Sequence, residues 1–296
     1  MRSRTALIIA FLALLGCSER RAPATAPLVD DFGEQVDRGT STAPARIVSL
    51  NPTTTDLLFA MGAGARVVGR THWDTWSDSV RRVADLGPGL RPNVESVLGL
   101  HPDLVILYAS ADNGDAARQL RAAGVDVIGL KVDRLADFER ATLMLGVATG
   151  EEQRARSVVD SVMRTIDRVR VATRPLPRPS VFWHIWDSPV IAIGGGSYMD
   201  ELLNIAGGRN VYGESSSPSP VVSIEDVIHR NPDIIIAGPE GAAHIRSSPV
   251  WQSVGAVRRG HVVVIDTMLV GRPAAQLGEA AVAIARLLHP EAGDLP

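Results

Sequence analysis

Four of the five tryptophans lie in two short segments that also contain histidine. Residues 71–76 read Thr-His-Trp-Asp-Thr-Trp, and residues 183–187 read Trp-His-Ile-Trp-Asp. An indole ring offers a large apolar face and one polar N–H group, and an imidazole can ligate haem iron. These residue types indicate a pair of aromatic walls for a flat, largely apolar ring such as a corrin or a porphyrin.

Side-chain alternation refines the second segment. Along a strand, alternate side chains point to opposite faces, which places His184 and Trp186 on one face and Trp183 on the other. The alternative is that all four tryptophans only fill the core, and axial ligation of a metal by either histidine stays open. We predict a buried Trp183 and a ligand that contacts His72, Trp73, Trp76, His184 and Trp186.

Catalysis is the rival class of function. Asp74 and Asp187 could form an acid–base set with His184, as a hydrolase would need. However, the sequence has no Gly-x-Ser-x-Gly motif, and its histidines form neither His-x-x-x-His nor His-Glu-x-x-His. We therefore expect no enzyme activity, no catalytic cofactor and no bare metal ion held by side chains.

The composition is that of a globular protein. Of the 296 residues, 45% are hydrophobic and 21% are charged, which argues against a disordered or fibrous class. The formal net charge of -3 argues against a nucleic-acid partner, because such proteins usually present a basic face.

The N-terminus has the pattern of an export signal. Two arginines precede the apolar run 6–15, which is too short for the ~20 residues that cross a bilayer as a helix. The run leads into Leu-Leu-Gly-Cys, ending at Cys17, which resembles the bacterial lipobox; an ordinary signal peptide with an incidental cysteine is the alternative. We predict a signal peptide over residues 1–16, a lipid on Cys17 and a flexible tether over residues 17–44. The mature protein would be exported to the periplasm, or to the outer face of the cell membrane, and anchored to a membrane by that lipid.

Beyond this tether the sequence predicts two Rossmann-like α/β lobes, over residues 45–147 and 177–292. One helix without Gly or Pro covers residues 151–173, inside a linking segment over residues 148–176. Two lobes joined by one long backbone helix would enclose a ligand cleft between them. We expect strands at 47–50, 103–107, 125–130, 180–186, 190–193, 233–237 and 261–266, and further helices at 55–61, 116–123, 198–206 and 274–288.

One pattern occurs twice, at an offset of 130 residues. Glu95 stands seven residues before Pro102, and Glu225 stands seven residues before Pro232. In both cases Pro-Asp then opens an apolar strand. The repetition predicts that the two lobes have a similar topology.

Four stretches, residues 46–62, 93–106, 200–211 and 222–236, resemble a known family. It comprises the substrate-binding proteins of bacterial cobalamin, haem and siderophore importers that have a single helix between their lobes. In this order, with their spacing, the stretches cover nearly all of residues 45–290. The resemblance implies capture of a large chelate and its delivery to an ABC permease, and we expect a monomer.

The cobalamin-binding members of the family are the most similar, so a corrinoid ranks first as ligand. Two of their ligand-contacting tryptophans align with Gly89 and Ser219, which leaves the aromatic contacts to the two tryptophan segments. Haem ranks second. A ferric siderophore ranks third, because its complex is commonly anionic and would favour several arginines in the cleft of the protein. Only Arg70, Arg209 and Arg272 are candidates for such a role. In members of the family the chain after the last strand often turns into the cleft, and Arg272 occupies that position.

Two glutamates occupy equivalent places in the two lobes. Glu95 and Glu225 each follow an expected helix N-cap, Asn93 or Ser223, by two residues. An acid in the first turn of a helix is favoured by the helix dipole, which explains them locally. The resemblance implies a second role, since family members use one surface glutamate per lobe to meet arginines of the permease.

Overall fold

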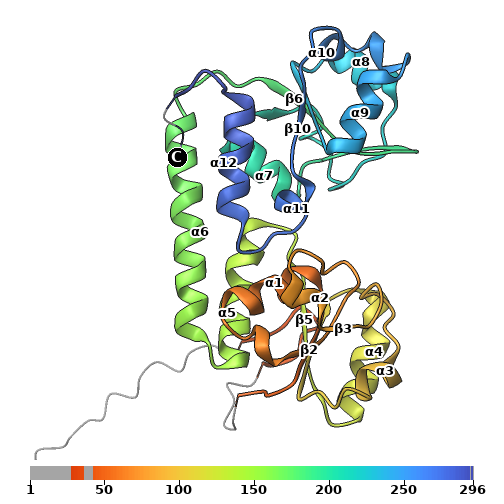
Figure 1. Cartoon of the computed structure of the whole chain (residues 1–296), viewed down its shortest axis with the longest axis vertical. Helices are drawn as coiled ribbons and strands as arrows, with labels where there is room; N and C mark the ends of the chain where they lie inside the picture. Colours follow the sequence, from red (N-terminus) through yellow and green to blue (C-terminus); the bar gives the residue numbers. More distant parts are fainter. Residues whose placement is uncertain (1–27, 37–42, 294, 296) are drawn as a thin grey trace, which may run out of the picture.

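The computed structural model describes residues 28–36, 43–293 and 295, and it has two α/β lobes stacked along one long helix, α6 (Figure 1). The N-terminal lobe contains a five-stranded parallel sheet in the order β3-β2-β1-β4-β5. The predicted fold class is confirmed. The strands of this lobe are β1 (Ile47–Leu50), β2 (Val67–Arg70), β3 (Ala84–Asp85), β4 (Leu104–Tyr108) and β5 (Asp126–Leu130). Its helices are α1 (Pro52–Ala60), α2 (Asp78–Arg81), α3 (Val94–Leu98), α4 (Ala111–Ala122) and α5 (Leu135–Thr149).

The C-terminal lobe has a second five-stranded sheet, in the order β10-β9-β6-β7 with β8 paired to β6. Only the pairing of β7 with β6 is antiparallel among the pairs of this sheet in the described residues. Its strands are β6 (Ser180–Asp187), β7 (Val190–Ala192), β8 (Arg209–Asn210), β9 (Ile234–Ala237) and β10 (Val262–Val264). Its helices are α7 (Tyr198–Ile205), α8 (Ile224–Arg230), α9 (Pro239–Ser247), α10 (Gly255–Arg258), α11 (Thr267–Val270) and α12 (Leu277–Leu288).

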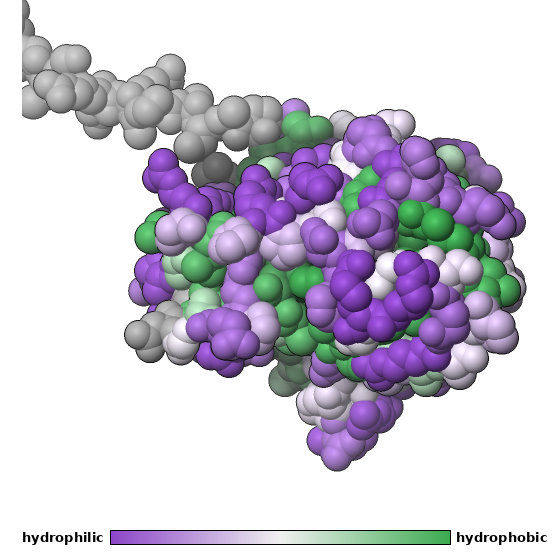
Figure 2. All heavy atoms as spheres, turned by 90° about the horizontal axis from the view of Figure 1, so that it is seen from above, coloured by the Kyte–Doolittle hydropathy of each residue, from purple (hydrophilic) through white to green (hydrophobic). Residues whose placement is uncertain are grey.

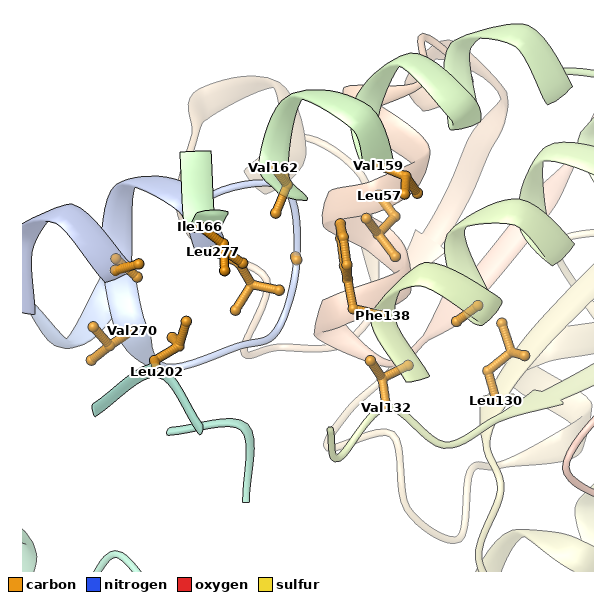
Figure 3. Packing of buried hydrophobic residues seen from close by; sticks show 14 of the residues in the cluster. Leu57, Leu130, Val132, Phe138, Val159, Val162, Ile166, Leu202, Val270 and Leu277 are labelled. Carbon is orange, nitrogen blue, oxygen red and sulfur yellow. The ribbon is translucent and has the colours of Figure 1, made fainter. Parts of the chain in front are cut away.

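Helix α6 (Glu152–Thr173) lies within the linking segment expected from the sequence. It carries one buried apolar stripe, which includes Val159, Val162 and Ile166. Figure 3 shows this stripe packing against Leu57 and Phe138 of the N-terminal lobe and against side chains of the C-terminal lobe farther along. Because one continuous core spans the helix and both lobes, the helix holds the lobes as a shared support.

The repeated Pro-Asp pattern has the same structural role in each lobe. Asp103 accepts hydrogen bonds from the backbone N–H groups of Ala45 and Arg46, both at 2.8 Å, just before β1. Asp233 accepts from the N–H and the hydroxyl of Ser180, at 2.7 and 2.6 Å, at the start of β6. Each aspartate therefore fixes the start of the first strand of its lobe, beside the parallel strand that the aspartate precedes.

The expected tether is corrected in part. Residues 28–36 are not free, because Asp30 and Asp31 hold them along β5, the edge strand of the N-terminal sheet. The Gly129 N–H donates to Asp30 Oδ2 at 2.7 Å, and the Lys131 N–H donates to Asp31 Oδ2 at 2.7 Å. The segment covers a strand edge that would otherwise expose unpaired backbone groups. Cys17, the expected signal peptide and the first part of the tether lie outside the described residues.

The surface and the helices agree with a folded two-lobed protein. Seen from above, hydrophilic and hydrophobic residues are interspersed over the visible face (Figure 2). Within the described ranges, the model contains no helix that combines the length and the apolar character needed to cross a membrane. A cavity of about 610 Å³ lies where α6 and α12 end, lined by residues 176–179, 233 and 288–292, away from the tryptophan segments.

Candidate functional site

Both tryptophan segments lie at carboxyl ends of strands. Residues 71–76 follow β2 directly, and residues 183–187 form the last part of β6. Open α/β sheets bind their ligands outside these strand ends, so the two segments stand where each lobe would contact a ligand.

Asp74 holds the first tryptophan segment, residues 71–76, through hydrogen bonds. It is fully buried, and its Oδ2 accepts from the N–H and the hydroxyl of Thr71, at 2.8 and 2.9 Å, and from the Thr55 hydroxyl at 3.3 Å. The Oγ1 atom of Thr55 also lies 2.9 Å from the hydroxyl oxygen of Ser49. Burial raises the pKa of Asp74 above its usual value, and the hydrogen bonds oppose the rise. The Ser/Thr-rich start of α1 therefore anchors the loop that carries Trp73 and Trp76.

The side chains of this loop lie at different depths. Trp73 is 63% exposed and its ring centroid lies 4.3 Å from that of the exposed His72. Trp76 is half-buried, and the guanidinium carbon of Arg272 lies 4.3 Å from the centroid of its ring. Because Arg272 precedes α12, this contact joins the two lobes.

Arg272 also forms an ion pair across the lobes. Its Nη2 and Nε donate to Oδ2 of Asp56 on α1, at 2.8 and 2.9 Å, and its Nη1 donates to the Met268 carbonyl at 3.0 Å. Burial raises the pKa of Asp56 above its usual value, while the Arg272 guanidinium opposes this rise. A second pair, Arg134 with Glu201 of α7, also crosses between the lobes.

The second segment departs from simple alternation. An irregularity in the β6–β7 pairing falls between His184 and Trp186, so the period-two prediction does not carry past it. Trp186 is 61% exposed, and its indole N–H donates to the Ser188 carbonyl at 3.2 Å. His184 is buried, so the two residues that alternation places on one face differ strongly in exposure. Trp183 is buried in the main core, as predicted.

His184 is held by neighbours of its own lobe. Its Nε2 lies 2.9 Å from Oδ1 of Asp187, and its ring meets that of Trp251 edge-on. Burial lowers the pKa of His184, with Asp187 opposing the shift, so the ring favours its neutral form. In this state the ring orients the end of β6. A hydrolase-like acid–base set is not assembled, because Asp74 is buried in the other lobe among threonines.

Gly89 and Ser219 are the two positions where the resemblance implied a loss of aromatic contacts. Gly89 has a φ of +83°, and a Cβ there would lie 2.6 Å from the Leu50 carbonyl oxygen, so the present backbone accepts no side chain at that position. Its neighbour Leu90 is 47% exposed. Ser219 is exposed, and Val221 two residues later is 65% exposed beside β7. Sequence reasoning missed Leu90 and Val221, because exposure of a single apolar residue in a loop leaves no periodic signal.

Neither of the other two candidate arginines stands free at the strand ends that carry the tryptophan segments. Arg70 is buried, donates to the Val80 and Thr71 carbonyls at 3.0 and 2.7 Å, and lies 3.6 Å from Asp85. Arg209 pairs with the start of β6, at the opposite end of that strand from Trp186.

Glu95 and Glu225 occupy matching places, as their spacing predicts. Each is exposed in the first turn of a short helix, α3 or α8, whose N-cap is Asn93 or Ser223. Hydrogen bonds from its own backbone N–H and from Ser223 lower the pKa of Glu225. In Figure 1, α3 and α8 both lie on the side of their lobe away from α6.

Two lobes on one helical support, with exposed aromatic residues at the strand ends of each, define a bilobal solute-binding protein. Residues 47–269 match the periplasmic binding protein family, and the chain belongs to that family. Its function is transport rather than catalysis, as the substrate-binding component that works with an ABC permease.

The chain is similar to two curated proteins over most of its length. It is 27% identical to an uncharacterized ABC transporter substrate-binding lipoprotein of Bacillus subtilis, covering 97% of this chain and 96% of that protein. It is 28% identical to a cobalamin-binding protein of Halobacterium salinarum, covering 83% of this chain and 70% of that protein.

Solved structures agree on the fold. The periplasmic vitamin B12-binding protein of Vibrio cholerae matches with a TM-score of 0.75 at 20% identity, covering 86% of this chain and 100% of that one. A periplasmic haem-binding protein of Pseudomonas aeruginosa also has a TM-score of 0.75, at 24% identity, covering 86% of this chain and 95% of that one.

Proposed function

We propose that the protein is a lipid-anchored substrate-binding protein that captures a corrinoid and delivers it to an ABC permease. The observation that carries the proposal is the pair of exposed tryptophans, Trp73 and Trp186, one at the strand ends of each lobe. Each lies within two residues of a buried polar group, Asp74 or His184, that is hydrogen-bonded to a neighbouring residue. The similarity to cobalamin-binding proteins supports the same ligand class.

The side chains at the site favour a corrinoid over an anionic siderophore complex. Arg70 and Arg272 are committed to partners within the protein, and Arg209 lies at the far end of β6. Haem is the second candidate, favoured by the exposed His72 beside Trp73, whereas the Nε2 of His184 already contacts Asp187. Axial ligation through Nε2 of His184 would therefore require that contact to break.

The ligand proposal is tested by titrating the soluble protein with cobalamin, cobinamide and haemin, followed by absorption and calorimetry. We expect a corrinoid to bind most tightly and to quench tryptophan fluorescence. Trp186→Ala and Trp73→Ala should each weaken binding by about 1–2 kcal/mol, the value of a stacked aromatic and its buried area. Val171→Ala, which truncates a 73%-exposed residue on α6, is the matched control and should change nothing. Unchanged affinity in both tryptophan variants would reject the site.

Delivery is proposed to use Glu95 and Glu225 as docking points on the permease. Both are exposed in the first turn of a short helix. Glu95→Arg with Glu225→Arg should abolish uptake into vesicles that contain the cognate permease, because like charges then face the permease arginines. Ligand affinity of the soluble protein should stay unchanged. Glu139→Arg with Glu291→Arg makes the same charge change at two other exposed glutamates and should leave uptake intact.

Membrane anchoring is proposed to occur through a lipid on Cys17. The lipobox-like sequence and the similarity to a Bacillus subtilis lipoprotein support this. Cys17→Ala should move the protein from the membrane fraction to the soluble extracytoplasmic fraction without changing ligand affinity. Retention of the variant in the membrane fraction would contradict the anchor.

A further inference from the structure

Arg272 is the cationic side chain placed between the lobes and against a tryptophan of the site. Two of its nitrogen atoms converge on one oxygen of Asp56, at 2.8 and 2.9 Å, which is the geometry of a charge-assisted pair. Its third nitrogen donates to the Met268 carbonyl, and the group stacks against Trp76 at 4.3 Å. The guanidinium thus has a partner on its edge and on its face.

The ion pair is also shielded from water. The side chains of Arg272 and Asp56 are only 13% and 10% exposed. Water screens such a pair weakly, so the two opposite charges stay together and largely cancel for a group that approaches Trp76. An anionic group on a ligand would meet a dipole there instead of a net positive charge.

Neither of the other two candidate arginines of the cleft replaces this charge. Arg70 is buried under its own carbonyl contacts, and Arg209 lies at the opposite end of β6. Arg134, which also crosses between the lobes, is paired with Glu201 at 2.5 Å. The charge that an anion meets at the site therefore depends on whether Asp56 holds Arg272.

We propose that Asp56 determines the charge specificity of the site: by neutralising Arg272, it makes the surface beside Trp76 favour an uncharged macrocyclic chelate over the same macrocycle with free carboxylates. This inference rests on the proposed binding of a macrocycle between the lobes. It assigns to an α1 residue, outside both tryptophan segments, the selection between neutral and anionic ligands.

The test compares ligands that share a macrocycle and differ in whether its peripheral groups are carboxylates. Cobinamide carries amide groups where cobyrinic acid carries carboxylates, and haemin dimethyl ester lacks the two carboxylates of haemin. In the wild-type protein we expect the member of each pair without peripheral carboxylates to bind more tightly. Asp56→Asn keeps the side-chain shape. In this variant the ratio of the two affinities should move toward the carboxylate member by about tenfold or more, because the positive charge of Arg272 then lacks its anionic partner.

Two further variants decide the cause of that change. Asp56→Asn combined with Arg272→Gln removes the freed cation and should return the ratio to its wild-type value. Glu151→Gln frees Arg66 from a pair of similar exposure at the base of α6 and should leave the ratio unchanged. A folded Asp56→Asn protein with a wild-type ratio would overturn the inference, and so would an equal shift in Glu151→Gln.

A measurement on the wild-type protein keeps the inference testable if Asp56→Asn does not fold. The affinity for the carboxylate ligands should stay nearly constant when salt rises from about 0.05 to 0.5 M, since a neutral site offers little charge to screen. Tighter binding of cobyrinic acid or haemin, weakening steeply with salt, would overturn the inference. If only the porphyrins bind, the corrinoid proposal fails while the porphyrin pair still tests Asp56; if no macrocycle binds, both proposals fail.

Discussion

The two lobes are alike where the first strand of each sheet begins and different where the strands end. At the beginning, Asp103 and Asp233 each hold the first strand through two short hydrogen bonds, one pair from the N–H groups of Ala45 and Arg46 and the other from the N–H and hydroxyl of Ser180. At the strand ends, one lobe presents a loop fixed by the buried Asp74, and the other presents a strand whose irregular pairing separates His184 from Trp186.

The shared strand beginnings belong to the scaffold, whereas the differing strand ends belong to the proposed ligand site. Asp103 and Asp233 recur at the same offset in the sequence because they serve a backbone geometry that both lobes share. The strand ends are where we propose that the ligand binds, and a ligand without internal symmetry requires different contacts from each lobe. Both strand ends nevertheless follow one physical rule, since an exposed tryptophan stands beside a buried polar group that has hydrogen-bond partners.

The largest expected effect separates core from site within one strand. Trp183→Ala removes a buried indole from the main core and should lower the free energy of unfolding by about 3–5 kcal/mol. Trp186→Ala, three residues on and 61% exposed, should lower it by about 0.5 kcal/mol or less. Chemical denaturation of both variants tests this, and comparable losses would mean that Trp186 is also part of the core.

The sequence predicts much of this architecture because periodicity reports burial. The α6 stripe and the buried strands each form regular patterns that tertiary contacts leave intact. Helices α5 and α9 were not predicted, although α5 packs along α6: its apolar residues follow a capped turn at Arg134 that resembles a loop in sequence.

The residue types of the site are more predictable than their arrangement. Placement of the tryptophans at strand ends follows from strand order, but the burial of His184 depends on the pairing irregularity with β7, which alternation alone does not encode. The partner of Arg272, Asp56, lies 216 residues away in the chain, and such long-range pairs leave no local pattern.

The next prediction concerns the charge of Asp74, the buried residue that holds the loop of residues 71–76 in the N-terminal lobe. The raised pKa of Asp74 means that the fold favours its protonated form. Its stabilising contribution is therefore complete below the usual pKa near 3.8 and is lost as pH rises through the higher folded value. Relative to the wild type, Asp74→Asn should gain stability as pH rises from about 4 to 7. The gain should be about 1.4 kcal/mol for each tenfold difference in proton affinity between the folded and unfolded states.

Unfolding free energies of the two proteins across that pH range give the measurement. The slope of their difference is informative, because the Asn amide can add a constant penalty where Oδ1 of Asp74 has no hydrogen-bond partner in the described structure. A difference that does not vary with pH would show that Asp74 has an ordinary pKa and that charge plays no part in holding the loop.

The smallest effect concerns the aspartates at the strand beginnings, and its pH dependence has the opposite sign. Hydrogen bonds from the hydroxyl and N–H of Ser180 lower the pKa of Asp233 below its usual value. Its contribution is therefore present above the usual pKa near 3.8 and is lost as pH falls through the lower folded value. Because Asp233 is exposed, Asp233→Ala should lower the free energy of unfolding by only about 1 kcal/mol at pH 7, and this cost should shrink in acid.

Asp103→Ala should cost the same at pH 7 if the two aspartates are equivalent. The costs should add in the double variant, because the sites share no partner. Unequal costs, or a cost for Asp233→Ala that grows in acid, would show that the two aspartates differ in energy although their hydrogen bonds look alike.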